Sequence, residues 1–160
     1  MKKRKRQTDK GFSLAELIMV IGILTFLVVI LVPQLMKLVE RSQVSNDERV
    51  ADLVRKSVMT ALMDNAVTED EDYAADIKPF QRNGGASIIY IGSNTFGDKV
   101  AAALGERDGS VIDEKWVSRQ LSSRDAEDII VEIIDEEIVR VTIKGSHSDA
   151  AGGRDPIVVQ

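Results

Sequence analysis

The chain has 160 residues, enough for one domain, and its 44% hydrophobic and 29% charged residues exclude both a disordered chain and a protein embedded in a membrane throughout. It contains no cysteine, which excludes disulfides, thiolate metal sites and thiol catalysis. The net charge is −5, but residues 1–11 hold six basic residues against one acidic residue, so the remainder of the chain is strongly acidic.

An uncharged segment, residues 17–36, follows this basic start. As a helix it would be about 30 Å long, which is roughly the hydrocarbon thickness of a bilayer. A core helix of a soluble protein is rarely apolar on every face. A secretory signal peptide would have a shorter apolar region and a small-x-small cleavage site, and neither is found here. We therefore expect a membrane-spanning helix with a cytoplasmic N-terminus.

A carboxylate, Glu16, lies at the edge of this apolar segment, where it costs several kcal/mol unless it is paired or neutralised. Ser13 and Glu16 have the spacing of a capping box, with Ser13 as the N-cap and Glu16 at the third helical position. Phe12 and Leu17 then occupy the positions of a hydrophobic staple. Capping explains an acid at this place in a soluble helix, but explains less well why the helix continues into a membrane.

These residues together resemble the N-terminal signature of type IV pilins and the related pseudopilins. The resemblance covers residues 10–35: a basic leader, Gly11 followed by Phe12, Glu16 four residues further on, and an apolar stretch that reaches Pro33. It implies an α+β, type IV pilin-like fold, in which a long N-terminal helix packs on a small antiparallel β-sheet head. The helix would have a membrane half and an amphipathic half.

The resemblance also implies a role for each signature residue. Gly11 would be the last residue of the leader, removed by a prepilin peptidase on the cytoplasmic side. Phe12 would become the new N-terminus and be N-methylated. Glu16 would pair with the α-amino group of Phe12 in a neighbouring subunit. Because that amine is an amide before cleavage, processing would act as the switch for assembly.

Two further residues are expected to loosen the helix, Gly22 and Pro33. Many family members carry a helix-loosening glycine two or three positions after Gly22, where this chain has Leu24 and Thr25. Gly22 is the candidate to replace it. Pro33 removes one amide donor, leaves the carbonyl of Val29 without its partner and favours a kink. We therefore expect local melting between Gly22 and Pro33 when subunits pack together.

An amphipathic helix is predicted for residues 37–65, because apolar residues recur there with an i, i+4 spacing. Asp52 and Lys56 have the spacing of a favourable ion pair on this helix. The boundaries that follow are a leader at 1–11, a membrane or filament-core helix at 12–36, the amphipathic helix at 37–65 and a globular head at 66–160. The apolar stripe comprises Val50, Val54, Val58 and Leu62, joined by Ala51 and Ala61 on the same side.

Residues 66–85 are predicted to form a loop, with four consecutive acids at 69–72 and a turn at Asn83-Gly84-Gly85. The acids could supply oxygen ligands to calcium, but their spacing fits no known calcium loop, and a solvated face is the simpler interpretation. A strand is predicted at 87–91. Asn94 or Thr95 is expected to cap a short helix that ends at Gly105.

The remainder of the head contains the clearest β pattern. Residues 113–121 could form a helical turn or a loop, and Trp116 is expected in the core. Residues 129–134 and 138–143 predict two strands around an acidic turn. With the strand at 87–91, they would form an antiparallel sheet of at least three strands that packs on the helix stripe. Residues 145–156 are predicted to form a surface loop, and 157–159 either an edge strand or a frayed end.

Enzymatic activity has little support in this sequence, and no cofactor or metal is expected. His147 is the single histidine and lies in a polar stretch. The sequence contains no phosphate-binding glycine loop, zinc-ligand spacing or serine–histidine–acid set. From Lys37 onward there are 15 basic and 24 acidic residues, a balance that disfavours nucleic-acid binding by the head.

Three functions remain. The first is a structural subunit of an extracellular type IV pilus-like filament, inserted in the cytoplasmic membrane before assembly, with a prepilin peptidase, a pilus assembly platform and identical or related subunits as partners. The second is a pseudopilin of a type II secretion or DNA-uptake system. The third belongs to another class: a single-pass, membrane-anchored binding module that does not polymerise.

Overall fold

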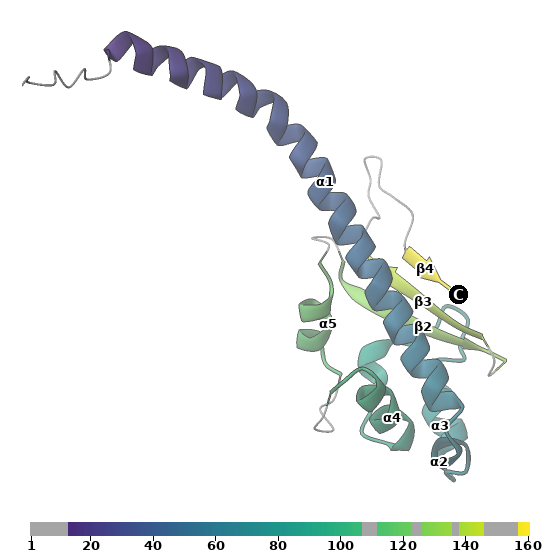
Figure 1. The fold of residues 1–160 in the computed structure, drawn as a ribbon. Coiled ribbons are helices and arrows are strands. Elements are labelled where there is room, and N and C mark those ends of the chain that lie inside the picture. The colour runs from purple at the N-terminus through teal and green to yellow at the C-terminus, as the bar shows by residue number, and fades with distance from the viewer. Residues whose placement is uncertain (1–12, 107–111, 123–125, 136–137, 146–156) are drawn as a thin grey trace, which may run out of the picture. The chain divides into compact units, whose positions relative to one another are not determined.

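The computed structural model describes residues 13–106, 112–122, 126–135, 138–145 and 157–160. The chain forms two compact units, Met1–Val39 and Glu40–Gln160. One long helix, α1 (Leu14–Leu62), contributes to both of them (Figure 1). The second unit contains the remaining helices and the sheet, so the fold belongs to the α+β class.

The second half of α1 supplies a buried stripe to the second unit. Its buried apolar residues repeat with helical spacing, as the sequence pattern predicts. Val50 and Leu62, at the two ends of the expected stripe, are only partly buried. The predicted ion pair is present, with Lys56 Nζ 2.5 Å from a carboxylate oxygen of Asp52. The buried apolar residues of this stripe are Ala51, Val54, Val58 and Ala61.

A four-stranded antiparallel sheet forms the other side of the core, in the order β1-β2-β3-β4. The central hairpin matches the predicted strands to within one residue, and Glu132 pairs directly with Arg140. Residues 157–159 form an edge strand rather than a frayed end. The strands are β1 (Ala86–Ser87), β2 (Asp128–Ile134), β3 (Ile138–Lys144) and β4 (Ile157–Val159).

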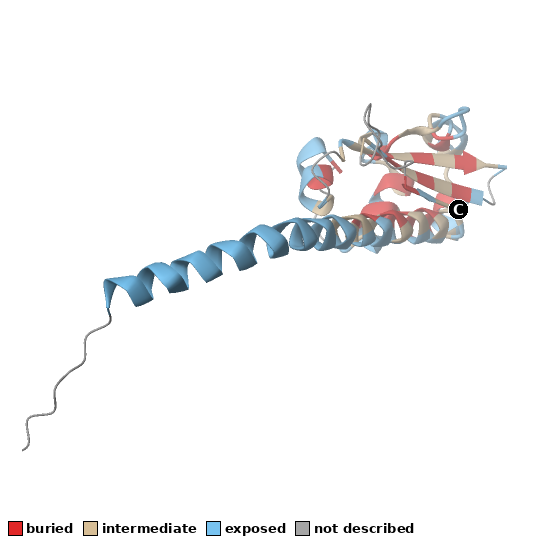
Figure 2. Cartoon of the chain, turned by 90° about the horizontal axis from the view of Figure 1, so that it is seen from above, coloured by how far each residue is buried: buried red, intermediate tan, exposed pale blue. Residues whose placement is uncertain are grey.

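Burial alternates along both central strands, which gives the sheet one inner and one outer face. The inner side chains and the buried stripe of α1 belong to one continuous hydrophobic cluster (Figure 2). The expected packing of the sheet and the helix stripe around a common core is therefore confirmed. The inner residues of the two strands are Ile129, Val131, Ile133, Val139, Val141 and Ile143.

The prediction of a loop over residues 66–85 is wrong in part, because two short helices form there, α2 (Asn65–Thr68) and α3 (Tyr73–Ile77). Asp64 caps α2 by accepting the N–H of Ala66 at 2.9 Å. Val67 and Ile77 supply the apolar anchors of these helices and are buried. Each helix buries only one large side chain, so the acidic sequence around it shows no helical pattern of apolar residues.

The prediction of a strand at 87–91 is also corrected. Strand β1 ends at Ser87, and residues Ile88–Tyr90 form a short 3₁₀ helix, η1. Ser87 Oγ accepts the N–H of Ile89 at 3.4 Å, which favours the helical turn over continued pairing. Gly85 has a φ of 69° and lies close to the neighbouring strand. Glycine is required at this position, because a Cβ there would lie 2.3 Å from the carbonyl oxygen of Val131.

Two helices complete the second unit, α4 (Thr95–Ala103) and α5 (Glu114–Gln120). Asn94 caps α4, as predicted, by accepting the N–H of Gly97 at 2.6 Å. Residues 113–121 were predicted to form either a helical turn or a loop, and the presence of α5 shows that they form a helix. Trp116 on α5 is buried, as expected, and its indole N–H donates to Glu106 Oε1 at 2.9 Å.

Helix α1 also buries a carboxylate that the sequence analysis missed. Asp47 is fully buried, and its Oδ1 accepts the backbone N–H of Ser122 at 2.7 Å. The preceding residue, Asn46, donates from Nδ2 to Ser122 Oγ at 2.7 Å. These bonds fasten the segment after α5 to α1. In the sequence, Asp47 lies four residues before Ala51 and therefore on the same face of the helix. An acidic residue on the face predicted to be buried indicates a carboxylate that bonds to another part of the chain.

We predict that Asp47→Ala lowers the free energy of unfolding by about 1–3 kcal/mol, because the N–H of Ser122 loses its buried acceptor. Glu48→Ala is the matched control: this neighbouring side chain is exposed, and its loss should cost less than about 0.5 kcal/mol. Denaturant unfolding of the full chain in detergent, followed by the fluorescence of the single buried Trp116, measures both variants. Equal stabilities of the two variants would contradict a structural role for Asp47.

Candidate functional site

The N-terminal half of α1 presents a continuous apolar surface that the described part of the chain leaves uncovered. Every residue from Ser13 to Ser42 is exposed (Figure 2). The large apolar side chains between Leu14 and Val39 keep 44–75% of their surface accessible. Such a surface exceeds what a monomeric soluble protein exposes to water. Lipid or other protein chains are what covers a surface of this kind.

By length and composition, α1 can cross a membrane. It is the one such helix in the described residues, and none of its most apolar window is buried within the molecule. A core helix of a soluble protein is mostly buried, so the exposure argues against that interpretation. Thr25, a polar residue in this stretch, satisfies its hydroxyl within the helix by donating to the carbonyl of Ile21 at 2.8 Å.

Glu16 lies in the first turn of this helix and turns back toward its start. Its Oε2 accepts the backbone N–H of Ser13 at 2.8 Å, which is the glutamate half of the expected capping box. The carbonyl of Ser13 accepts the N–H of Leu17 at 3.1 Å, so Ser13 begins the helix. No described residue bonds to its other oxygen, Oε1. Glu16 can therefore cap its own helix and accept one further donor or cation.

The expected partners of Glu16 lie outside the described residues. Gly11 and Phe12, the predicted processing and methylation positions, both precede Ser13, the first described residue. The expected hydrophobic staple between Phe12 and Leu17 therefore stays a prediction. Of the signature residues, the structure places Glu16, Gly22 and Pro33 on one helix.

Helix α1 is continuous through both positions that were expected to loosen it. Pro33 lies inside the helix, and Gly22 has helical neighbours on both sides. A Cβ added at Gly22 would meet nothing within 4 Å. Packing inside the chain therefore does not require glycine there. Melting between Gly22 and Pro33 on assembly stays a prediction.

The acidic segment 69–72 is organised by hydrogen bonds to neighbouring residues. Thr95 donates its hydroxyl to Asp70, and the N–H of Asp72 donates to the same side chain at 3.0 Å. These bonds hold the pKa of Asp70 below its ordinary value. Partial burial raises the pKa of nearby Asp76, against a hydrogen bond from Asn94. Within the described ranges no group of three or more His, Cys, Asp or Glu side chains could hold a metal ion.

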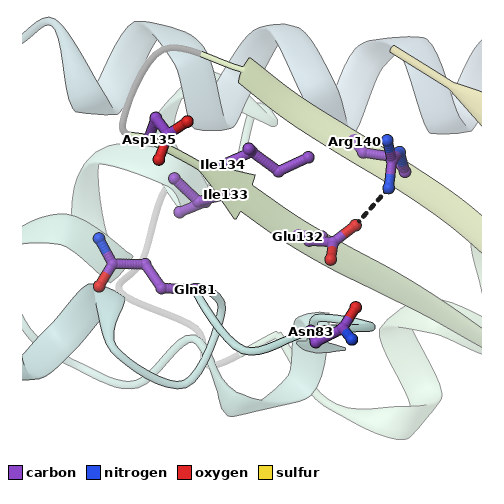
Figure 3. Close-up of a pocket in the computed structure, with 7 residues that line it drawn as sticks. All are labelled: Gln81, Asn83, Glu132, Ile133, Ile134, Asp135 and Arg140. Atoms are coloured by element: carbon purple, nitrogen blue, oxygen red, sulfur yellow. Dashed lines mark hydrogen bonds and ion pairs between the residues drawn. The ribbon is translucent and has the colours of Figure 1, made fainter.

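A shallow, open hollow of about 740 Å³ lies at the end of the β2–β3 hairpin (Figure 3). Its central polar group is Glu132, whose Oε2 accepts from Arg140 Nη1 at 2.8 Å and whose Oε1 accepts the N–H of Gly84 at 2.9 Å. Both carboxylate oxygens are thus engaged by the protein itself. The remaining lining residues are Gln81, Asn83, Ile133, Ile134 and Asp135. The contacts of Glu132 therefore join the two strands of the hairpin to each other and to the turn at Gly84.

Comparisons of this chain with protein-family models, with curated proteins and with solved structures found no match. The architecture, a long N-terminal apolar helix together with a small antiparallel sheet, is compatible with that of a pilin. Function has to be inferred from the residues of the chain. The feature that needs a functional explanation is the uncovered helix with a carboxylate in its first turn.

We predict that Gly22→Ala stabilises the free chain locally by about 1 kcal/mol, because alanine is the better helix former and its methyl group meets open space. Amide hydrogen exchange of α1 in detergent should slow on both sides of the substitution. Gly97→Ala is the contrasting variant: its Cβ would lie 1.8 Å from the carbonyl oxygen of Gly92, so α4 should be destabilised. Faster exchange around residue 22 would show that Gly22 has a packing role within the chain.

Proposed function

We propose that this chain is the structural subunit of an extracellular, type IV pilus-like helical filament. In this proposal a prepilin peptidase cleaves after Gly11, Phe12 becomes an N-methylated terminus, and the apolar half of α1 passes from the cytoplasmic membrane into the filament core. A pilus assembly platform would drive that transfer. The second unit of the chain would coat the outside of the filament.

The observation that carries the proposal is the continuous apolar surface of α1 between Leu17 and Met36, with Glu16 in the first turn of the helix. Lipid alone could cover the apolar surface. A carboxylate at that depth is costly in lipid, however, unless a cation approaches it. A bundle of such helices covers the apolar surface of each subunit, and it can also supply the cation.

The chemistry of cleavage supports the same model. Cleavage after Gly11 would convert an uncharged amide at Phe12 into a cationic amine. One carboxylate oxygen of Glu16 accepts the N–H of Ser13 and the other bonds to no described residue, so Glu16 can accept a neighbour's amine without losing its cap. Removing both charges from water is tolerable only when they pair with each other. Uncleaved subunits would therefore stay in the membrane, and cleaved ones would assemble.

Two other functions are compatible with the same features. A pseudopilin of a type II secretion or DNA-uptake system would use the same processing and pairing, but would form a short fibre that stays with the cell envelope. A membrane-anchored binding module would keep its N-terminal residues uncleaved. Where the processed chain is found distinguishes these possibilities.

We expect mass spectrometry of material sheared from cells to find an N-terminal peptide that begins at methylated Phe12. The membrane fraction of the same cells is measured beside it. A peptide beginning at Phe12 and confined to membranes would favour the pseudopilin. An intact Met1 in both fractions would overturn the filament proposal and leave the membrane anchor.

We predict that Glu16→Gln lowers the yield of filaments by at least about tenfold, because the open side-chain oxygen can no longer form an ion pair. The amide oxygen of glutamine can still accept the N–H of Ser13, so the helix start is preserved. Glu40→Gln is the matched control, since Glu40 is exposed on the same helix and makes no ion pair with any described residue. Electron microscopy and quantification of sheared protein measure the yield. Normal filaments from Glu16→Gln would contradict the pairing.

A further inference from the structure

One face of α1 within the second unit has no partner in the described part of the chain. Four exposed residues lie along it at helical spacing, and we call them the outer stripe: Ser45, Arg49, Leu53 and Lys56. Leu53 keeps 47% of its surface accessible, and Arg49 makes no ion pair with any described residue. The stripe therefore combines an exposed apolar side chain with two cations: Lys56, which pairs with Asp52, and Arg49, which pairs with no described residue.

A second surface of the same unit carries the opposite charge. Directly after α2 in the chain, Glu69, Glu71 and Asp72 are exposed and make no ion pair with described residues. We call these three residues the acidic end. Asp70, between them, is engaged with Thr95 and does not take part.

The charges of the chain as a whole follow the same division. Residues 63–160 contain 10 basic and 20 acidic residues. Residues 40–62 contain four basic and four acidic residues, and Asp47, one of those four acids, is fully buried. The exposed part of α1 is thus a weakly positive surface on an otherwise strongly negative unit. A negatively charged protein surface is the complement it lacks.

We propose that the outer stripe of one copy binds the acidic end of a second copy of this chain. The inference rests on the proposed function and names the contact between the exposed units. Two different surfaces that meet form a heterologous contact, which repeats from copy to copy and does not need to close. Such a contact is what a filament requires.

The positions of the two surfaces along α1 fit parallel copies. Arg49 and the end of α1 at Leu62 are 13 residues apart, about 20 Å along the helix. The acidic end follows α1 in the chain, after α2. Copies that share one membrane orientation are parallel, so the acidic end of one can reach the outer stripe of another only when the two are displaced along the helix. The contact thereby sets a stagger between neighbours.

Burial of Leu53 and pairing of Arg49 contribute in different ways. Exposed ion pairs are weak and are screened by salt. The pairing of Arg49 therefore determines which partner binds and in which register, and adds little to the affinity. Leu53 supplies apolar area at the centre of the stripe. Removal of charge should therefore reduce the contact without abolishing it.

Disulfide trapping tests the contact directly, because the chain has no cysteine of its own. Full-length chains that carry either Leu53→Cys or Glu71→Cys, with different tags, are produced in the same cells and oxidised in membranes and in sheared material. We expect disulfides between the two variants at a yield at least about fivefold above that of Ser118→Cys with Glu71→Cys. Ser118 is exposed on α5 and belongs to neither surface.

Charge reversal supplies the second arm of the test. Arg49→Glu in the Leu53→Cys chain should lower the trapped fraction, and Glu69→Lys in the Glu71→Cys chain should restore it. Arg49 and Glu69 are exposed, so folding should be unaffected, and the fluorescence of Trp116 checks this. Reduction without restoration would overturn the ionic part of the contact.

The outcomes separate this contact from the proposed function. Filaments without trapping above the Ser118 control would overturn the contact and leave the filament function standing. Trapping that depends on Arg49 in cells that make no filaments would support the contact and overturn the filament function. Trapping equal to that of the control in either fraction would mean random collision and would overturn the contact.

Discussion

The structure depends on one constraint: the apolar surface of α1 between Leu14 and Val39 has to be kept away from water by something other than the described part of the chain. A helix that is apolar on every face has no favoured side. Lipid or a bundle of equivalent helices can both surround it. Glu16 breaks this symmetry, since it gives the first turn a charge for which lipid has no partner.

The same helix meets a different demand beyond Glu40. There only one stripe of α1 is apolar, and it shares a core with the sheet of the second unit. Asp47 lies on that stripe but bonds to Ser122, so a polar contact marks the place where the segment after α5 attaches. One continuous helix thus links a surface that must be covered from outside to a unit that provides its own core.

Much of the fold could be predicted from the sequence, and the errors have local causes. The β2–β3 hairpin was predicted to within one residue, because alternating burial is encoded directly in alternating side chains. The strand expected at 87–91 ends at Ser87 instead, since a serine hydroxyl can cap a turn as readily as it can sit in a strand. Helices α2 and α3 were missed, because four acids concealed two buried apolar residues.

The candidate site divides in the same way. Glu16, Gly22 and Pro33 were recognisable from sequence, since a carboxylate, a glycine and a proline inside an uncharged segment are exceptional wherever the segment folds. Asp47 and the outer stripe were not, because their importance depends on which face of α1 packs on the sheet. Composition and local spacing are properties of the sequence alone. They determined that an apolar helix exists and that Glu16 in its first turn can cap the helix and pair with a cation. Only the tertiary structure decided which face of the helix is buried and which is left for a partner, because that choice is made by packing against residues far away in the chain.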